Sequence, residues 1–295
     1  MLPGVDSLTK AMQAEIIADC GCEVGEVPMW HPTEKRLYWT DIPAGKLYWY
    51  DPETDAYEEC FDEGVVGGYT IQKDGTFLLF MERGAVRTWD GETLKTVVEE
   101  IPGEEDSRFN DVIADPEGRV FGGTMPTDDQ LGSLYRMDAD GSITELLDSV
   151  DLPNGMGFTP DRETLYLTES YTDTIYAFDY DAETGAIDNQ RVFVDASDDE
   201  GMPDGLTVDA EGYVWSAKFG GGCVVRYDPS GTEVKRYDIP AENVTSLLFA
   251  GEDFEDLYVT TATLEASDDD THAGDTFRLR PGVKGVEEFY SDVSV

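Results

Sequence analysis

The sequence predicts an all-β protein that folds as a six-bladed β-propeller. Two observations carry this prediction: a strand-and-turn pattern recurs six times along the chain, and no segment has the periodicity of a long amphipathic helix. The recurring unit is about 44 residues long and holds several short strands, which is the size and content of one propeller blade.

Each unit is marked by a short strand that follows a polar turn. These marker strands carry aromatic and β-branched residues, and their first residues are separated by 40, 43, 45, 49 and 43 positions: 37–40, 77–80, 120–121, 165–168, 214–216 and 257–260. A second strand with an Asp-, Gly- or Pro-containing turn follows each marker, at 46–55, 85–93, 133–142, 174–185, 223–231 and 276–282. Tight turns between such strands are typical of β-hairpins, so we expect antiparallel blades.

No Pro-, Gly- or Ser-rich linker divides the chain, so residues 1–295 are expected to form one propeller domain, with residues 1–12 as a flexible extension. The ring must also be closed. We expect the segment from Gln13 to Cys20 to pair with a C-terminal strand from Glu287 to Val293.

The charge of the chain excludes several kinds of partner. It carries 64 acidic and 20 basic residues, a formal net charge of −44, so binding to nucleic acid or to an anionic membrane is not expected. Disorder is not expected either, because 40% of the residues are hydrophobic and 11% are aromatic. Acids spread along the whole chain indicate a halophilic protein, whose self-repulsion is screened in molar salt, where the Debye length is about 3 Å.

The chain begins without the pattern of a signal peptide and has no apolar run long enough to span a bilayer. The four cysteines, at positions 20, 22, 60 and 223, lack the spacing of a zinc site and are interpreted as buried free thiols. These features favour a cytoplasmic protein, which we expect to be a monomer.

Four oxygen-bearing side chains occupy the same phase of the repeat. Glu26, Asn110, Asn154 and Asp204 each lie 10 or 11 residues before the marker strand of their unit. Equivalent positions of different blades converge on the central channel, so we expect the four to meet at one of its mouths. Two carboxylates and two carboxamides form a hard-oxygen site for a divalent cation, and neither histidine shares their phase. A purely structural explanation also exists, because Asn and Asp before Gly are common turn residues.

At these residues the sequence resembles the gluconolactonase/regucalcin (senescence marker protein) family. The resemblance is carried by GEVPMWHPTEKRLYWTDI, RFNDVIADPEGRVFGGTM, LPNGMGFTPDRETLYLTES and MPDGLTVDAEGYVWSAKFGGGCVVRYDP, at 25–42, 108–125, 152–170 and 202–229. It implies a six-bladed propeller in which Glu26, Asn154 and Asp204 hold one divalent metal.

The resemblance also implies substrate contacts. It assigns them to Arg108 and Asn110 of the R-x-N-D segment, and to an acidic residue after the GTM segment, for which Asp128 is the nearest match. The sequence departs from the family in having Val112 where Gly is usual. The implied reaction is hydrolysis of a sugar-acid lactone, such as glucono-, xylono- or arabinonolactone, with Ca²⁺, Mg²⁺, Mn²⁺ or Zn²⁺ as cofactor. Asp204 would serve as metal ligand and general base.

Two other functions remain open at this point. A phosphotriesterase of the diisopropyl-fluorophosphatase type has a similar propeller, and its calcium site of one Glu, two Asn and one Asp would use Asn110. A non-catalytic calcium-binding propeller would have the same ligands. The YWTD string at 38–41 matches the repeat of extracellular receptor propellers, but it occurs in one unit only.

Overall fold

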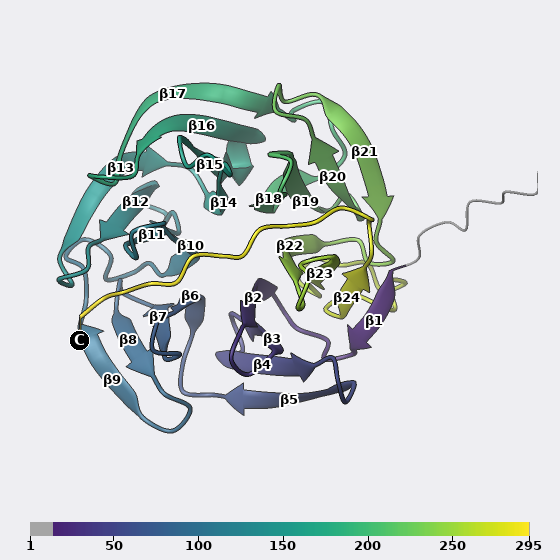
Figure 1. Ribbon diagram of the computed structural model, residues 1–295, viewed down its shortest axis with the longest axis horizontal. Coiled ribbons are helices and arrows are strands. Elements are labelled where there is room, and N and C mark those ends of the chain that lie inside the picture. Colours follow the sequence, from purple (N-terminus) through teal and green to yellow (C-terminus); the bar gives the residue numbers. More distant parts are fainter. Residues whose placement is uncertain (1–13, 295) are drawn as a thin grey trace, which may run out of the picture.

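Six four-stranded antiparallel sheets surround a central axis in the computed structural model, which describes residues 14–294 (Figure 1). The predicted six-bladed all-β propeller is therefore confirmed. The expected extension of residues 1–12 lies outside the described residues. In the described part of the chain the only helix is the three-residue turn η1 (Ser170–Thr172), and no helix there is long and apolar enough to cross a membrane.

The blades follow one another in sequence around the ring. Their strands, from the innermost outwards, are as follows. Blade 1 comprises β2 (Gly25–His31), β3 (Arg36–Asp41), β4 (Lys46–Asp51) and β5 (Ala56–Phe61), and blade 2 comprises β6 (Val66–Ile71), β7 (Phe77–Met81), β8 (Val86–Trp89) and β9 (Leu94–Val98). Blade 3 comprises β10 (Phe109–Ala114), β11 (Val120–Thr124), β12 (Gly132–Met137) and β13 (Ile143–Val150), and blade 4 comprises β14 (Pro153–Phe158), β15 (Thr164–Glu169), β16 (Thr174–Asp181) and β17 (Ala186–Asp195). Blade 5 comprises β18 (Met202–Val208), β19 (Val214–Phe219), β20 (Cys223–Tyr227) and β21 (Glu233–Asp238), and blade 6 comprises β22 (Val244–Ala250), β23 (Asp256–Thr261), β24 (Thr276–Leu279) and β1 (Glu15–Ala18).

Burial falls from the axis outwards. Every residue of the inner strand β14 is buried, whereas five of the six residues of the outer strand β21 are exposed. The apolar core lies between neighbouring blades. Tyr38 of blade 1, for example, packs edge-on against Phe77 of blade 2, with ring centroids 4.9 Å apart. The marker strands read from the sequence are the second strands of the blades, which explains their aromatic and β-branched content.

Ring closure differs from the expectation. The N-terminal strand β1 does close the ring, but its partner is β24, in the register Glu15 to Arg278, and not the segment from Glu287 to Val293. Blade 6 thus takes three strands from the C-terminal part of the chain and one from the N-terminal part.

The C-terminal segment, residues 283–294, instead crosses one face of the propeller as an extended strap (Figure 1, yellow). It is bound to the end of one inner strand and to the turns that follow two others: Ser291 N–H donates to Ile71 O, Ala210 N–H to Lys284 O and Asp292 N–H to Gly118 O. The segment predicted as the closing strand, Glu287 to Val293, lies within this strap. The hydrogen-bond partners of the strap are scattered over the ring, so it forms only isolated bridges.

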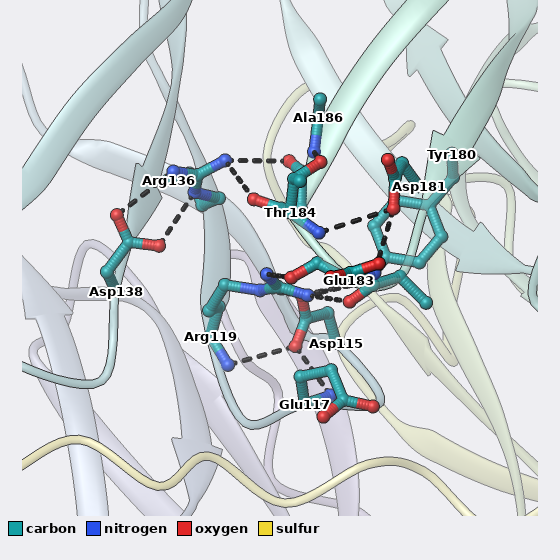
Figure 2. A network of polar contacts seen from close by, with 12 residues as sticks. Asp115, Glu117, Arg119, Arg136, Asp138, Tyr180, Asp181, Glu183, Thr184 and Ala186 are labelled. Atoms are coloured by element: carbon teal, nitrogen blue, oxygen red, sulfur yellow. Dashed lines mark hydrogen bonds and ion pairs between the residues drawn. The ribbon is translucent and has the colours of Figure 1, made fainter.

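Blades 3 and 4 are joined by a buried ionic latch (Figure 2). Arg119 pairs with Asp115 on its own blade, and its guanidinium also donates to Tyr180 Oη and to the carbonyl oxygens of Ala182 and Glu183 in the β16–β17 turn. Asp115 is fully buried and accepts a further bond from Tyr180 Oη at 2.8 Å. The latch therefore fixes the hairpin turn of one blade to the neighbouring blade.

Substitution of Arg119 by Met is expected to lower the free energy of unfolding by about 3 kcal/mol, because it leaves the buried Asp115 carboxylate without its counter-charge. Denaturant unfolding in molar KCl measures this loss. The double variant Arg119→Met/Asp115→Asn is the control and should recover part of it. A single variant within about 1 kcal/mol of the wild type, which is the range of an exposed ion pair, would contradict a buried latch.

Candidate functional site

A cavity of about 290 Å³ opens at the end of the channel where the inner strands begin, opposite the strap. Most of its polar side chains come from the starts of four inner strands, and Ser170 and Glu265 come from the connections after two second strands, whereas its remaining walls are largely apolar. The lining residues are Val24, Glu26, Arg108, Asn110, Met125, Leu152, Asn154, Ser170, Tyr171, Met202, Asp204, Phe219, Leu264 and Glu265. The four residues predicted from the repeat phase therefore do meet at one mouth.

A β-bulge lies at each of the four positions. The pairing of the inner strand with its neighbour is interrupted between residues 26 and 29, 109 and 112, 153 and 156, and 203 and 206. An extra residue in one strand bends it and turns a side chain out of the regular alternation. The bulges therefore explain how Glu26, Asn110, Asn154 and Asp204 reach the cavity from strands that are otherwise packed between blades.

The bulge at Glu26 carries backbone strain. Val27 has φ of 49°, a left-handed conformation that a β-branched residue rarely adopts. Its amide donates to Glu26 Oε2 at 3.1 Å, which holds the carboxylate against its own backbone. Strain of this kind persists where surrounding structure enforces it, and it is concentrated at functional sites.

The glycines after Asn154 and Asp204 are not turn residues. A Cβ on Gly155 would stand 2.1 Å from Leu206 N of the next blade, and one on Gly205 would stand 2.4 Å from Ser246 Oγ. These glycines are required because adjacent inner strands approach closely at the bulges. The turn explanation of the NG and DG pairs is thus wrong, and the two pairs belong to the construction of the site.

The cavity holds two buried carboxyl groups, those of Glu26 and Asp204, whose negative charges repel one another. Burial raises the pKa of Glu26 well above its usual range, and Asp204 and Asp111 raise it further, while the N–H of Val27 and the Arg108 guanidinium oppose the shift. Burial likewise raises the pKa of Asp204, with Asp111 adding to the effect. Glu26 and Asp204 are each 6% exposed, and Asp204 Oδ1 has no hydrogen-bond partner among the described residues.

The carboxamides belong to a chain of hydrogen bonds that crosses three blades. Arg108 Nη1 donates to Asn110 Oδ1 at 2.9 Å, and Asn110 Nδ2 donates to Asn154 Oδ1 at 3.1 Å. Asn154 Nδ2 donates to Ser170 Oγ at 3.1 Å, and Ser170 Oγ donates to Pro203 O at 2.7 Å, directly before Asp204. These hydrogen bonds set the orientation of the two carboxamides, because the oxygen of each accepts from one neighbour and the nitrogen donates to the next.

The donor set fits a divalent cation. A cation would neutralise the repulsion between Glu26 and Asp204 and would supply the partner that Asp204 Oδ1 lacks. No group of three or more His, Cys, Asp or Glu side chains that could hold a metal occurs within residues 14–294. A cation here would therefore also need oxygen atoms of other kinds, such as the carboxamide oxygens at this mouth, a ligand type that suits Ca²⁺ and other hard cations.

Carboxylates continue down the channel behind the cavity. Asp111 is half-buried, and burial raises its pKa to about 7. Glu288 of the strap has its pKa raised to about 7 by burial, with Asp111 adding to the shift. The channel is thus acidic from the cavity to the strap, which favours retention of a cation at its open end.

The structure places one predicted residue outside the cavity and adds others. Asp128 is exposed in the loop between β11 and β12 and does not line the cavity. An acidic side chain is instead contributed by Glu265, on the loop after β23, where the backbone is left-handed with φ of 59°. Ser170 and Glu265 were missed because they lie in connections after second strands, whereas the predicted residues were identified from their position in inner strands.

The chain matches a known family profile over most of its length. Residues 24–263 match the SMP-30/Gluconolactonase/LRE-like region. Pentonolactonase XacC of Haloferax volcanii is 49% identical over 287 residues, covering 94% of this chain and 97% of that protein. Regucalcin of Danio rerio is 35% identical, with 90% and 94% covered.

The fold is likewise similar to that of solved structures. A calcium-binding protein, regucalcin, from Agrobacterium tumefaciens superposes with a TM-score of 0.88 at 27% identity and covers 95% of this chain and 97% of its own. Both the sequence matches and the similar fold confirm the predicted resemblance to the gluconolactonase/regucalcin family.

Proposed function

The chain belongs to the SMP-30/gluconolactonase/LRE-like family, and from this membership and the site we propose that it hydrolyses sugar-acid lactones with a divalent cation as cofactor. The observation that carries the proposal is the pair of buried carboxylates, Glu26 and Asp204, beside the hydrogen-bonded carboxamides at the channel mouth. A pentonolactonase that is 49% identical over nearly the whole chain favours lactones of five-carbon sugar acids as substrates.

We assign the cation to Glu26, Asn154 and Asp204. When bound, it supplies a Lewis acid that polarises the lactone carbonyl and stabilises the negative charge of the tetrahedral transition state. The three side chains come from three different blades, so the rigid ring sets their separation.

The remaining residues bind the sugar and move the proton. Arg108 uses Nη1 for Phe109 O and Asn110 Oδ1, and no hydrogen bond within residues 14–294 uses its Nη2, which is left for the hydroxyl groups of the lactone. We assign proton removal from the attacking water to the Asp204 carboxylate, through the oxygen that does not bind the cation; burial raises the pKa of this group. The apolar walls, including Leu152 and Phe219, exclude bulk water from these groups.

The phosphotriesterase alternative requires a second Asn as a metal ligand. Asn110 Oδ1 accepts a hydrogen bond from Arg108, and its Nδ2 is used by Pro153 O and Asn154 Oδ1. Asn154 Oδ1 likewise accepts one hydrogen bond, from Asn110, so these bonds alone do not separate a three-ligand from a four-ligand site. The pentonolactonase that is 49% identical to this chain favours the lactonase.

The experiment that tests the proposal follows acid release in molar KCl with xylono-, arabinono- and gluconolactone, each corrected for spontaneous hydrolysis. We expect turnover of at least one lactone and none of a fluorophosphate ester under the same conditions. Turnover of the ester alone would support the phosphotriesterase, and no turnover with any lactone would favour a binding protein.

Ser170 is expected to act as a positioning residue for Asn154 through its hydroxyl group. Substitution by Ala removes the acceptor for Asn154 Nδ2 and the bond to Pro203 O, so the cation affinity should fall about 10-fold, as for other residues that orient metal ligands. The affinity is measured by calorimetric titration with Ca²⁺ or Mn²⁺ of protein from which a chelator has removed the cation. The control, Ser170→Thr, keeps the hydroxyl group and should retain most of the affinity; equal affinity in the Ala variant would disprove the role.

A further inference from the structure

Two cysteines stand next to one another beside the first blade, outside the cation site. Cys20 and Cys22 are separated by Gly21, which has φ of 60°, and their sulfur atoms are 3.3 Å apart. Cys20 is half-buried and reachable from solvent, whereas Cys22 is buried among apolar residues that include Trp39. Only two of the four thiols are therefore buried as the sequence predicted; Cys20 and Cys60 are partly accessible.

The surroundings of the pair favour a thiolate at Cys20. The largest cause lowering the pKa of Cys20 is its hydrogen bond with Cys22, and the Thr276 side chain lowers it further. The Trp39 side chain is fully buried beside the pair, its Nε1 has no hydrogen-bond partner among the described residues, and it lowers the pKa of both thiols. Cys22 has its pKa raised by the hydrogen bond with Cys20 and by burial. One accessible nucleophile is thus paired with one buried thiol that keeps its proton.

We propose that Cys20 and Cys22 form a redox-active dithiol that closes to an intramolecular disulfide when a small-molecule disulfide oxidises it, with Cys20 as the attacking residue. This proposal is independent of the lactonase activity, because neither cysteine lines the cavity.

The reaction proceeds in two exchanges. The Cys20 thiolate attacks one sulfur of the oxidant RSSR, so that a mixed disulfide forms and RS⁻ leaves, and this RS⁻ takes the proton of the Cys22 thiol. The Cys22 thiolate then attacks Cys20 Sγ and displaces the second RS⁻, which is protonated by solvent. In sum, two protein thiols are oxidised to one disulfide and RSSR is reduced to two RSH. The 3.3 Å separation places the resolving sulfur in contact with the sulfur that it attacks.

Disulfide formation would be transmitted to the cavity through the backbone of Cys22. Its N–H donates to Gly274 O and its carbonyl accepts from Thr263 N–H, while Leu264 N–H donates to Glu23 O. These bonds fasten the loop between β23 and β24, which contributes Leu264 and Glu265 to the cavity wall. A disulfide brings the sulfurs from 3.3 Å to about 2 Å, and we expect the backbone that holds this loop to take up part of this movement.

The test treats the folded protein in molar KCl with hydroxyethyl disulfide and maps the cysteine-containing peptides by mass spectrometry. We expect the wild type to lose two hydrogens in the peptide that holds Cys20 and Cys22, without retained hydroxyethyl thiol. Cys22→Ser should instead accumulate the mixed disulfide on Cys20, and Cys20→Ser should leave this peptide unmodified. Cys60 is a built-in control, because burial raises its pKa to about 12 and it has no neighbouring thiol within hydrogen-bond distance in the described part of the chain.

Two further results decide the proposal. Hydrogen exchange at the amides of Thr263 and Leu264 should change between the reduced and oxidised wild type and remain constant in Cys22→Ser. A stable mixed disulfide on Cys20 of the wild type, or modification of Cys20 and Cys60 at equal rates without an internal disulfide, would overturn the proposal. Neither outcome depends on whether any lactone is hydrolysed.

Discussion

Replacement of Asp204 by Asn is expected to lower kcat/KM for the best lactone by at least about 10³-fold, because the change removes a ligand charge and the group assigned to proton removal. The variant keeps the shape of the side chain and leaves the hydrogen bond from Ser170 Oγ to Pro203 O in place. Initial rates measured by acid release in molar KCl, at saturating cation, give the size of the loss.

The fold of this variant should survive. Asp204 is a buried carboxylate whose pKa is raised by burial and by Asp111, so its charge costs free energy in the cation-free protein. Its neutral substitute should therefore leave the thermal midpoint of the cation-free protein unchanged or higher. Lost activity with an unchanged midpoint separates a chemical role from unfolding.

A matched control is available in the same channel. Glu288 on the strap is also a carboxyl group with its pKa raised by burial, but it lies beyond the cavity and is not assigned to the cation. Glu288→Gln should retain the kcat/KM of the wild type. Equal losses in both variants would mean that the net charge of the channel matters and not the identity of the ligand, and wild-type rates in Asp204→Asn would remove Asp204 from the mechanism.

The propeller and the meeting of its site residues could be predicted because both follow from periodicity. A repeat of about 44 residues places equivalent positions on equivalent parts of the ring, so the common phase of Glu26, Asn110, Asn154 and Asp204 translates directly into proximity. The sequence also marks the bulges indirectly, since Gly155 and Gly205 are needed where inner strands approach one another.

Features outside the repeat could not be predicted in this way. The strap has no counterpart in other blades, so its extended residues were interpreted as the closing strand that β1 required. Glu265 and Ser170 lie in connections whose lengths differ between blades, and nothing in their local sequence says that they fold over the channel. The substrate contact was assigned to Asp128 from its position after the GTM segment, but residues 128–131 of this loop are exposed to solvent.

Removal of the cation by a chelator is the second large effect that we expect. Lactone hydrolysis should fall to the spontaneous rate, and adding back a divalent cation should restore it, because the carbonyl loses its Lewis acid and Glu26 and Asp204 regain their mutual repulsion. Stability provides a readout that does not depend on activity. A ligand that binds only the folded state at 100 times its dissociation constant stabilises it by about 2.7 kcal/mol, so the thermal midpoint should drop on chelation and recover on add-back.

The two predictions test each other when they are combined. If Asp204 is a ligand, the shift in thermal midpoint between chelated and cation-saturated protein should largely disappear in Asp204→Asn and persist in Glu288→Gln. If Asp204 only removes a proton, Asp204→Asn should lose turnover but keep the full shift. All measurements need molar KCl, since at a net charge of −44 a change in salt alters the stability of the whole propeller and would mask one cation at the channel mouth. A midpoint that chelation leaves unchanged in the wild type would exclude a cation bound at Glu26, Asn154 and Asp204, whatever the activity assays show.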